Sequence, residues 1–174
     1  EFNGIFVYEN FEWKHYSSKD LGAIGDIVAV TQDPDNPYKI WANAWGTGIV
    51  EIVDGKTETL YNNLNTDGAL TGVSDESDIR TGGLTFDDNG VLWATNSLSD
   101  KPLIKKDKQG NWTSYGFGSL SSGSIAFKDI LVNDLGQIWM QTRLTGFVVV
   151  EFINGQAVGR GYRASIGNGN LPED

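Results

Sequence analysis

The chain has 174 residues, a formal net charge of −10 and no cysteine. This length can bury a real hydrophobic core, and the lack of cysteine excludes a disulfide scaffold, a thiol nucleophile and a thiolate zinc site. The acidic balance argues against nucleic acid as a partner, because affinity for a phosphate backbone comes mainly from Lys and Arg.

The charge is uneven along the chain. Residues 1–100 hold 17 acidic and 5 basic side chains, a net of −12, whereas residues 101–174 hold 6 and 8, a net of +2. An anionic partner would therefore meet the second half of the chain first. No apolar run reaches the roughly 18 residues of a membrane span, so we expect no transmembrane segment in this sequence.

The first patterned stretch is Gly4–Tyr16, GIFVYENFEWKHY, which matches Gly48–Tyr61 with one residue fewer. Each stretch has two β-prone runs around a polar turn, which predicts a hairpin. Three copies of a longer unit then follow, aligned on a Trp and ending in a Tyr. They are Ile27–Tyr61 with Trp41, Gly82–Tyr115 with Trp93, and Asp129–Tyr162 with Trp139.

Each copy contains four short β-prone runs in the same order. A first run leads into an Asp/Asn turn, an Ile-Trp or Leu-Trp run follows, and a third aliphatic run joins a last run through a turn with Gly. The three Trp residues lie 52 and 46 positions apart, close to the blade length of known propeller repeats. The sequence therefore predicts an all-β chain of four-stranded antiparallel propeller blades.

The predicted organisation is a single partial β-propeller over residues 1–174, with about three and a half blades. It comprises a half blade at 1–18, blades at about 26–62, 82–116 and 127–163, and a lead-in to a further blade at 164–174. Polar loops at 62–80 and 116–124 join the blades. Because three and a half blades cannot close a ring, we expect a longer protein, terminal faces covered by other chain, or association of copies.

Catalytic and metal-binding patterns are weak in this sequence. His15 is the only histidine, so no His-based triad or His-rich metal site can form. The Asp-rich turns at 33–36 and 87–90 fall where the repeat needs hairpins, and the acidic loop 75–78 lacks the spacing of an EF-hand. The Gly159–Ala164 stretch fits GxGxxA but opens no helix. We expect no metal, no cofactor and no enzymatic activity.

The aromatic residues divide into two groups. Trp41, Trp93 and Trp139 share one repeat position, which predicts inter-blade core. Trp45 lies outside the repeat, in the loop after the second strand of its copy. With Arg80, Asn96 and Arg143, it forms our candidate ligand-binding set, in which carbohydrate or peptide would stack and hydrogen-bond near one propeller face.

The repeat resembles the two-component-regulator type of propeller repeat, D-x-x-G-x-(I/L)-W followed by a Gly-aliphatic strand. The matching segments are Asp87–Trp93, Asn133–Trp139 and, more loosely, Asp33–Trp41. The longer stretches at 61–65, 79–97 and 102–112 are most similar to PorZ-type propeller proteins of the type IX secretion system of Bacteroidetes. The likeness spans nearly all 174 residues.

This resemblance implies part of a seven-bladed ring in an exported protein, at the cell surface, outer membrane or periplasm. The implied role is a non-enzymatic scaffold or ligand-binding module of the secretion and attachment machinery, with lipopolysaccharide, another surface glycan or secretion proteins as partners, besides other blades of the full-length protein. A periplasmic propeller that senses oligosaccharides for a hybrid two-component system is the first alternative. A propeller lyase or glycosidase is the second.

Overall fold

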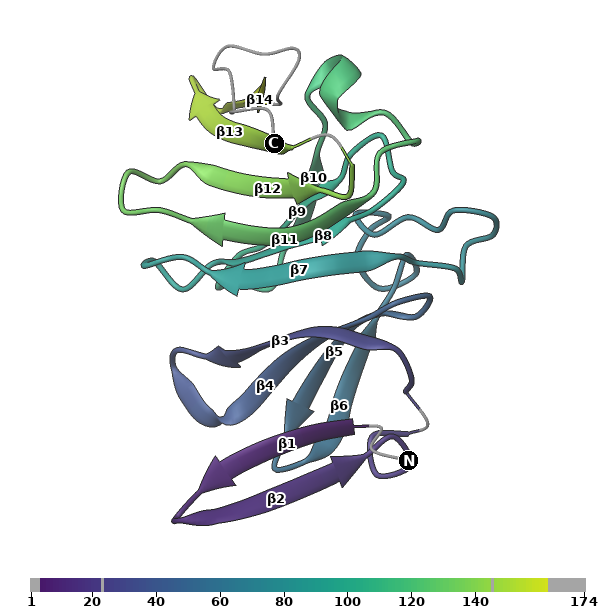
Figure 1. Ribbon diagram of the computed structural model, residues 1–174, viewed down its shortest axis with the longest axis vertical. Coiled ribbons are helices and arrows are strands. Elements are labelled where there is room, and N and C mark those ends of the chain that lie inside the picture. The colour runs from purple at the N-terminus through teal and green to yellow at the C-terminus, as the bar shows by residue number, and fades with distance from the viewer. Residues whose placement is uncertain (1–3, 23, 145, 163–174) are drawn as a thin grey trace.

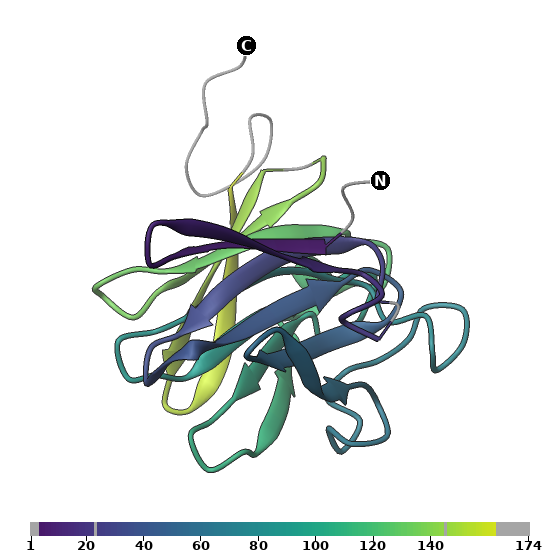
Figure 2. The same cartoon turned by 90° about the horizontal axis from the view of Figure 1, so that it is seen from below.

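The computed structural model describes residues 4–22, 24–144 and 146–162. They form one two-stranded and three four-stranded antiparallel sheets, and the one helix among them is the 3₁₀ turn η1, Gly118–Ser121. The all-β class and the blade architecture are therefore confirmed. Figure 1 shows the four sheets following one another along the long axis, and Figure 2 shows the same sheets overlapping when seen from below.

The two-stranded sheet is the N-terminal hairpin of β1 (Gly4–Glu9) and β2 (Glu12–Ser17). Its two turn residues, Asn10 and Phe11, both have positive φ, which is the geometry that a tight hairpin needs. The next sheet contains β3 (Ile27–Asp33), β4 (Asn36–Ala44), β5 (Gly48–Val53) and β6 (Lys56–Tyr61) in simple sequence order.

The other two sheets have the same order of strands. One contains β7 (Thr81–Phe86), β8 (Leu92–Asn96), β9 (Leu103–Lys106) and β10 (Trp112–Tyr115). The last contains β11 (Phe127–Val132), β12 (Ile138–Thr142), β13 (Phe147–Ile153) and β14 (Gln156–Tyr162). All three first strands have a register shift near their beginning. Residues 164–174, predicted to lead into a further blade, lie outside the described residues.

Three apolar layers hold the sheets together. Ile5, Val7 and Tyr16 of the hairpin pack on Val50 and Ile52 of the β3–β6 sheet. The two remaining layers are similar: Trp41 and Ile49 pack against Leu84, Leu92 and Ile104, while Trp93 and Leu103 pack against Phe127, Ile138 and Val150. Each sheet is thus covered by its neighbour in sequence, as blade stacking requires.

The three repeat-position tryptophans are not equally buried. Trp41 is 2% exposed and Trp93 is 6% exposed, so both belong to inter-blade core as predicted. Trp139 is 37% exposed, which differs from the prediction. Its neighbours Ile138 and Met140 lie in the core shared with the β7–β10 sheet, so strand alternation places Trp139 on the opposite side of the β11–β14 sheet, which no other sheet of the described residues covers.

The first strands of the three full sheets lie side by side at the inner edge. There β7 contacts both β3 and β11. This approach needs glycine: a Cβ on Gly82 would lie 2.5 Å from the carbonyl oxygen of Phe127, and one on Gly83 would lie 2.6 Å from the amide nitrogen of Ile130. The pair of glycines therefore lets the two backbones meet, which brings the loops at the ends of these strands close together.

Candidate functional site

The strand registers place the candidate residues at one end of the sheets. Each first strand begins opposite the end of its second strand, through the pairs Ile27 with Ala44, Thr81 with Asn96 and Phe127 with Thr142. Residues just after the second strands and just before the first strands therefore share one end of the sheets. Trp45 follows β4, Arg143 follows β12, Arg80 precedes β7 and Asn96 ends β8.

A cleft of about 560 Å³ opens at this end, at the inner edge of the sheets. We call it the inner cleft, and it contains two of the four candidate residues. The three first strands contribute part of its wall, so residues more than 100 positions apart meet there. Its lining consists of Val28, Trp45, Gly82, Ala126, Phe127, Lys128, Asp129 and Arg143.

Arg80 lies beside the inner cleft and contacts Trp45. Its guanidinium carbon is 5.8 Å from the centre of the Trp45 ring, within the range of a cation–π interaction. The backbones next to these two residues are also joined, because the amide of Gly46 donates to the carbonyl of Ile79 at 2.9 Å. Arg80 is therefore in place to fix the orientation of the indole.

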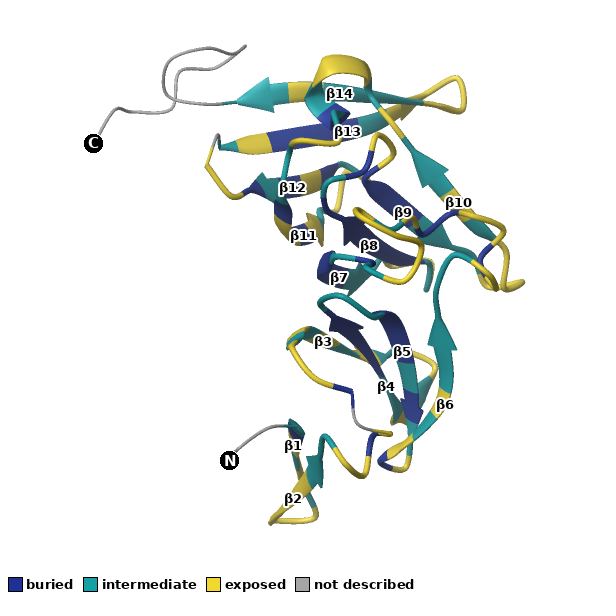
Figure 3. Ribbon diagram, turned by 90° about the vertical axis from the view of Figure 1, so that its right-hand side faces the viewer, coloured by how far each residue is buried: buried dark blue, intermediate teal, exposed yellow. Residues whose placement is uncertain are grey.

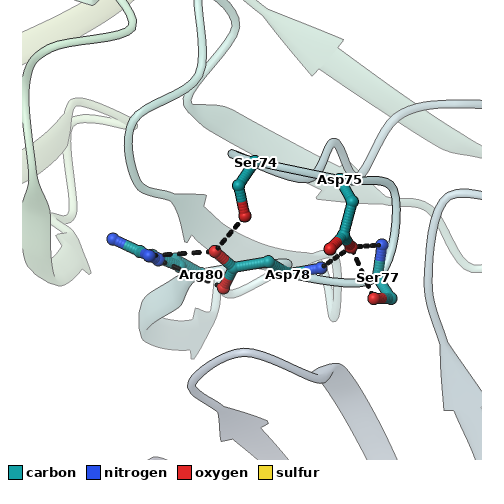
Figure 4. Close-up of polar contacts among 5 residues, drawn as sticks. All are labelled: Ser74, Asp75, Ser77, Asp78 and Arg80. Carbon is teal, nitrogen blue, oxygen red and sulfur yellow. Dashed lines mark hydrogen bonds and ion pairs between the residues drawn. The ribbon is translucent and has the colours of Figure 1, made fainter.

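Arg80 is itself held by the acidic loop before β7, shown in Figure 4. Its Nε and Nη2 donate to the two carboxylate oxygens of Asp78 at 3.2 and 2.9 Å. The hydrogen bond from Arg80 lowers the pKa of Asp78, and the Ser74 hydroxyl also donates to this carboxylate. The Asp75 carboxylate accepts from Ser77 and from the amide of Asp78, so the loop is organised around its own carboxylates.

Asn96 is separate from the other three candidate residues. Its side chain is fully buried, and its Oδ1 accepts hydrogen bonds from the amide of Thr71 at 2.7 Å and from the Thr71 hydroxyl at 3.2 Å. It thereby attaches the 62–80 connection to the end of β8. Burial keeps Asn96 out of the lining of the inner cleft.

The charge of the inner cleft differs from that of the whole chain. Lys128 and Arg143 contribute two positive charges and Asp129 one negative charge, a net of +1 in a chain of net −10. All three side chains are exposed. Within the described residues, Arg143 and Lys128 have no ion-pair contact to an acidic side chain. An aromatic ring beside exposed cations can bind a sugar ring or peptide that carries negative charge.

Sequence reasoning missed Lys128, Asp129 and Val28. The signal was available in the repeat, since each lies near the start of a first strand and first strands line the inner edge of a propeller. Composition could not reveal that these residues line the inner cleft, because their neighbours in the cleft come from other sheets.

The Asp-rich turns have a structural role in the residues described. Asp87 Oδ1 accepts from the amides of Asn89 and Val91, and Asn133 Oδ1 accepts from those of Leu135 and Gln137. These contacts satisfy the hairpin backbones, as predicted from turn geometry. Over residues 4–22, 24–144 and 146–162, no group of three or more His, Cys, Asp or Glu side chains is arranged to hold a metal ion.

These sheets and their stacking define the chain as a set of β-propeller blades. Comparison with solved structures gives the same fold. PorZ of Porphyromonas gingivalis, described as an essential bacterial surface component of the type IX secretion system, is similar with a TM-score of 0.73 and 20% identity, over 84% of this chain and 21% of PorZ.

The extracellular domain of BT4673 from B. thetaiotaomicron, described as part of a hybrid two-component system, is also similar. Its TM-score is 0.62 at 14% identity, over 98% of this chain and 20% of that chain. A second structure of the BT4673 extracellular domain gives 0.61 at 15% identity, over 91% and 21%. This chain thus spans about a fifth of the structures it matches. No protein-family model matches the sequence, and no curated protein matches it.

Membrane-spanning helices were sought in the same described segments. None of the helices there has the length and hydropathy needed to cross a bilayer.

Proposed function

We propose that this chain is a non-enzymatic propeller module of an exported protein and that it binds an acidic glycan or a protein segment at the inner cleft. The observation that carries the proposal is the meeting of Trp45 with Lys128 and Arg143 in one cleft of about 560 Å³. The cleft is large enough for one or two sugar rings or a short peptide segment, in the range of small-ligand sites.

The chemistry of the cleft favours an anionic ligand. Trp45 offers an apolar face for stacking, and Arg143 offers a planar group that can pair with a carboxylate or phosphate through two hydrogen bonds. The positive potential is local, because the net charge of the chain is −10. Lipopolysaccharide and acidic surface glycans have both the sugar rings and the negative groups that this arrangement would recognise.

The cellular role that we propose is a scaffold or attachment component of a type IX secretion system at the cell surface. Support comes from the fold, which is similar to that of PorZ with a TM-score of 0.73. The second candidate is an extracytoplasmic sensor of oligosaccharides, supported by the similar fold of the BT4673 extracellular domain. Both roles use a propeller as a binding surface and require no chemistry from it.

Binding is tested by calorimetric titration with two probes: purified lipopolysaccharide in detergent micelles and a neutral cello-oligosaccharide. We expect saturable binding of the acidic probe and much weaker binding of the neutral one. Trp45→Ala and Arg143→Ala should each reduce affinity about tenfold or more, since a hydrogen bond to a charged group contributes roughly 1.5–3 kcal/mol. Lys56→Gln, at the far end of the β3–β6 sheet, is the matched control and should bind like wild type.

Equal affinity of wild type and both cleft variants for every probe would disprove the role of the inner cleft. Deleting the gene in the host bacterium distinguishes the two cellular roles. Loss of a secretion component should leave cargo proteins in the periplasm. Loss of a sensor should leave secretion intact and abolish the transcriptional response to an oligosaccharide.

A further inference from the structure

The strand β11 has an irregularity at the end that lines the inner cleft. Its register shifts between Phe127 and Ile130. Within the shift, Lys128 and Asp129 together oppose the single residue Gln141 of β12. This two-against-one pairing is a β-bulge, which changes the direction of side chains and is frequent beside functional sites. The residues on either side of the bulge are buried in the core, so Lys128 and Asp129 are exposed together and both line the inner cleft.

The other two first strands have register shifts at the same place but carry no charge there. The two residues within the shift of β7 are Gly82 and Gly83, and the shift of β3 falls at Val28. Gly82 and Val28 also line the inner cleft. Burial follows the sequence, because β7 is buried over its first four residues whereas β11 has two exposed residues in its bulge (Figure 3). Among the three first strands, β11 therefore brings charge into the cleft, with a cation and a carboxylate adjacent in the chain.

The preceding sheet fixes the backbone of the β11 bulge. Thr95, at the position that Asn43 holds in its own sheet, donates to the carbonyl of Lys128 at 3.1 Å. The hydroxyl of Ser97 donates to the carbonyl of Phe127 and accepts the amide of the same residue at 3.0 Å. A rigid backbone positions the side chains of the bulge before a ligand arrives, which reduces the entropy cost of binding.

Arg143 completes the charged part of the cleft. Its backbone amide donates to the carbonyl of Ala126 at 2.8 Å, next to the start of β11. Two cations, Arg143 and Lys128, therefore share the cleft with one carboxylate, that of Asp129. Within residues 4–22, 24–144 and 146–162, Asp129 makes no ion pair with a basic side chain. This carboxylate is thus exposed in the cleft and accessible to a positively charged group of a ligand.

We propose that the inner cleft selects a sugar that carries a protonated amine together with an anionic group, and that Asp129 selects the amine. This inference rests on the proposed binding of an acidic glycan at the cleft. Arg143 and Lys128 bind the anionic group, and Trp45 packs on the sugar ring. The Asp129 carboxylate accepts hydrogen bonds from the ammonium group. Asp129 repels a ligand that has only negative groups, so acylation of the amine weakens binding.

The test is a titration followed by nuclear magnetic resonance of the Trp45 indole signal, at a pH at which amino sugars are protonated. Three probes differ in these groups: muramic acid has an amine and a carboxylate, N-acetylmuramic acid has only the carboxylate, and glucosamine has only the amine. Muramic acid should bind about tenfold more tightly than N-acetylmuramic acid, since acetylation removes a charge-assisted hydrogen bond. Glucosamine should also bind more weakly than muramic acid, because it lacks the anionic group.

The variant Asp129→Asn separates selection from a merely structural role. It removes the negative charge, so it should weaken binding of muramic acid and strengthen binding of N-acetylmuramic acid until the two affinities are similar. A structural role of Asp129 would instead weaken both probes. Asp134→Asn is the matched control, because Asp134 is an exposed residue of the hairpin between β11 and β12, outside the cleft lining. It should keep the wild-type preference.

Equal binding of muramic acid and N-acetylmuramic acid by wild type would overturn selection by Asp129 and leave the proposed function standing. An Asp129→Asn variant that weakens both probes alike would also overturn it. If no probe shifts the Trp45 signal, this inference fails, and the titration with lipopolysaccharide then decides the proposed function separately. Circular dichroism shows whether Asp129→Asn is folded, and the comparison of probes on wild type needs no variant.

Discussion

The indole nitrogen of Trp93 donates to Oδ2 of Asp87 at 3.0 Å, across the hairpin that joins β7 and β8. Trp41 and Asp33 make the same contact at 3.1 Å in the preceding sheet. The other oxygen of Asp87 accepts two backbone amides of the turn. One carboxylate thus closes the hairpin and orients the core tryptophan, which explains why Asp and Trp occur together in the repeat.

Replacing Asp87 tests the two parts of this contact separately. Asp87→Asn keeps an oxygen for the turn amides but offers the indole no second acceptor, so we expect a loss of about 0.5–1.5 kcal/mol in unfolding free energy. Asp87→Ala also leaves the turn amides without their acceptor and should cost more. Urea denaturation measures both, with Asp88→Asn in the same turn as control. Equal stability of all three variants would contradict this account.

The Asn43 side chain should contribute strongly to the contact between the second and third sheets in sequence. Asn43→Ala removes both hydrogen bonds to the carbonyls of Gly82 and Gly83 at a fully buried position. We expect a loss of about 1–3 kcal/mol, the cost of leaving buried polar groups unsatisfied. Asn43→Thr, which copies Thr95, should recover part of this loss. Denaturation midpoints measure the effect, and an Asn43→Ala variant as stable as wild type would refute it.

Gly83 should tolerate no side chain. A Cβ there would lie 2.6 Å from the amide nitrogen of Ile130 and 2.7 Å from Cα of Asp129, and both are backbone atoms that cannot move aside alone. Gly83→Ala should therefore destabilise the chain by about 1–3 kcal/mol or more. Gly25→Ala is the matched control, because its Cβ meets nothing within 4 Å and should leave stability unchanged or slightly higher. A neutral Gly83→Ala variant would show that the inner strands are further apart.

Acid should release Arg80 from its position over Trp45. The hydrogen bond from Arg80 lowers the pKa of Asp78 in the folded chain. The ion pair therefore contributes stability above the ordinary carboxyl pKa of about 3.9, and this contribution is lost as pH falls through the lowered value. Nuclear magnetic resonance should show the Trp45 indole signal moving together with protonation of Asp78, at pH values where the fold remains intact.

The Asp78→Asn variant is the control for this titration. The Trp45 signal of this variant should already resemble that of the acid form at neutral pH. It should stay constant over the pH range in which Asp78 is protonated in the wild type. A wild-type Trp45 signal that stays constant while Asp78 is protonated would show that the ion pair does not position Arg80.

Local patterns predicted most of the strands correctly. Turn residues such as those at 87–90 and the alternation around Trp93 are local signals, and repetition across three copies removed the ambiguity of each short run. The candidate site was less predictable. Trp45 was chosen because it lies outside the repeat and Arg143 as a polar group near the same propeller face, and the structure brings them into one cleft. Asn96 was also chosen as a polar group near that face, but it is buried against Thr71.

The sequence by itself determined the repeat, its four strands and the turn chemistry, because hairpins form between neighbours in the chain and depend on local residues. Only the tertiary structure decided which faces are covered and which side chains meet. Trp41 and Trp139 share one position in the repeat, yet one is buried and the other is partly exposed. Burial depends on the presence of an adjacent sheet, and a residue's own pattern cannot report what packs against it.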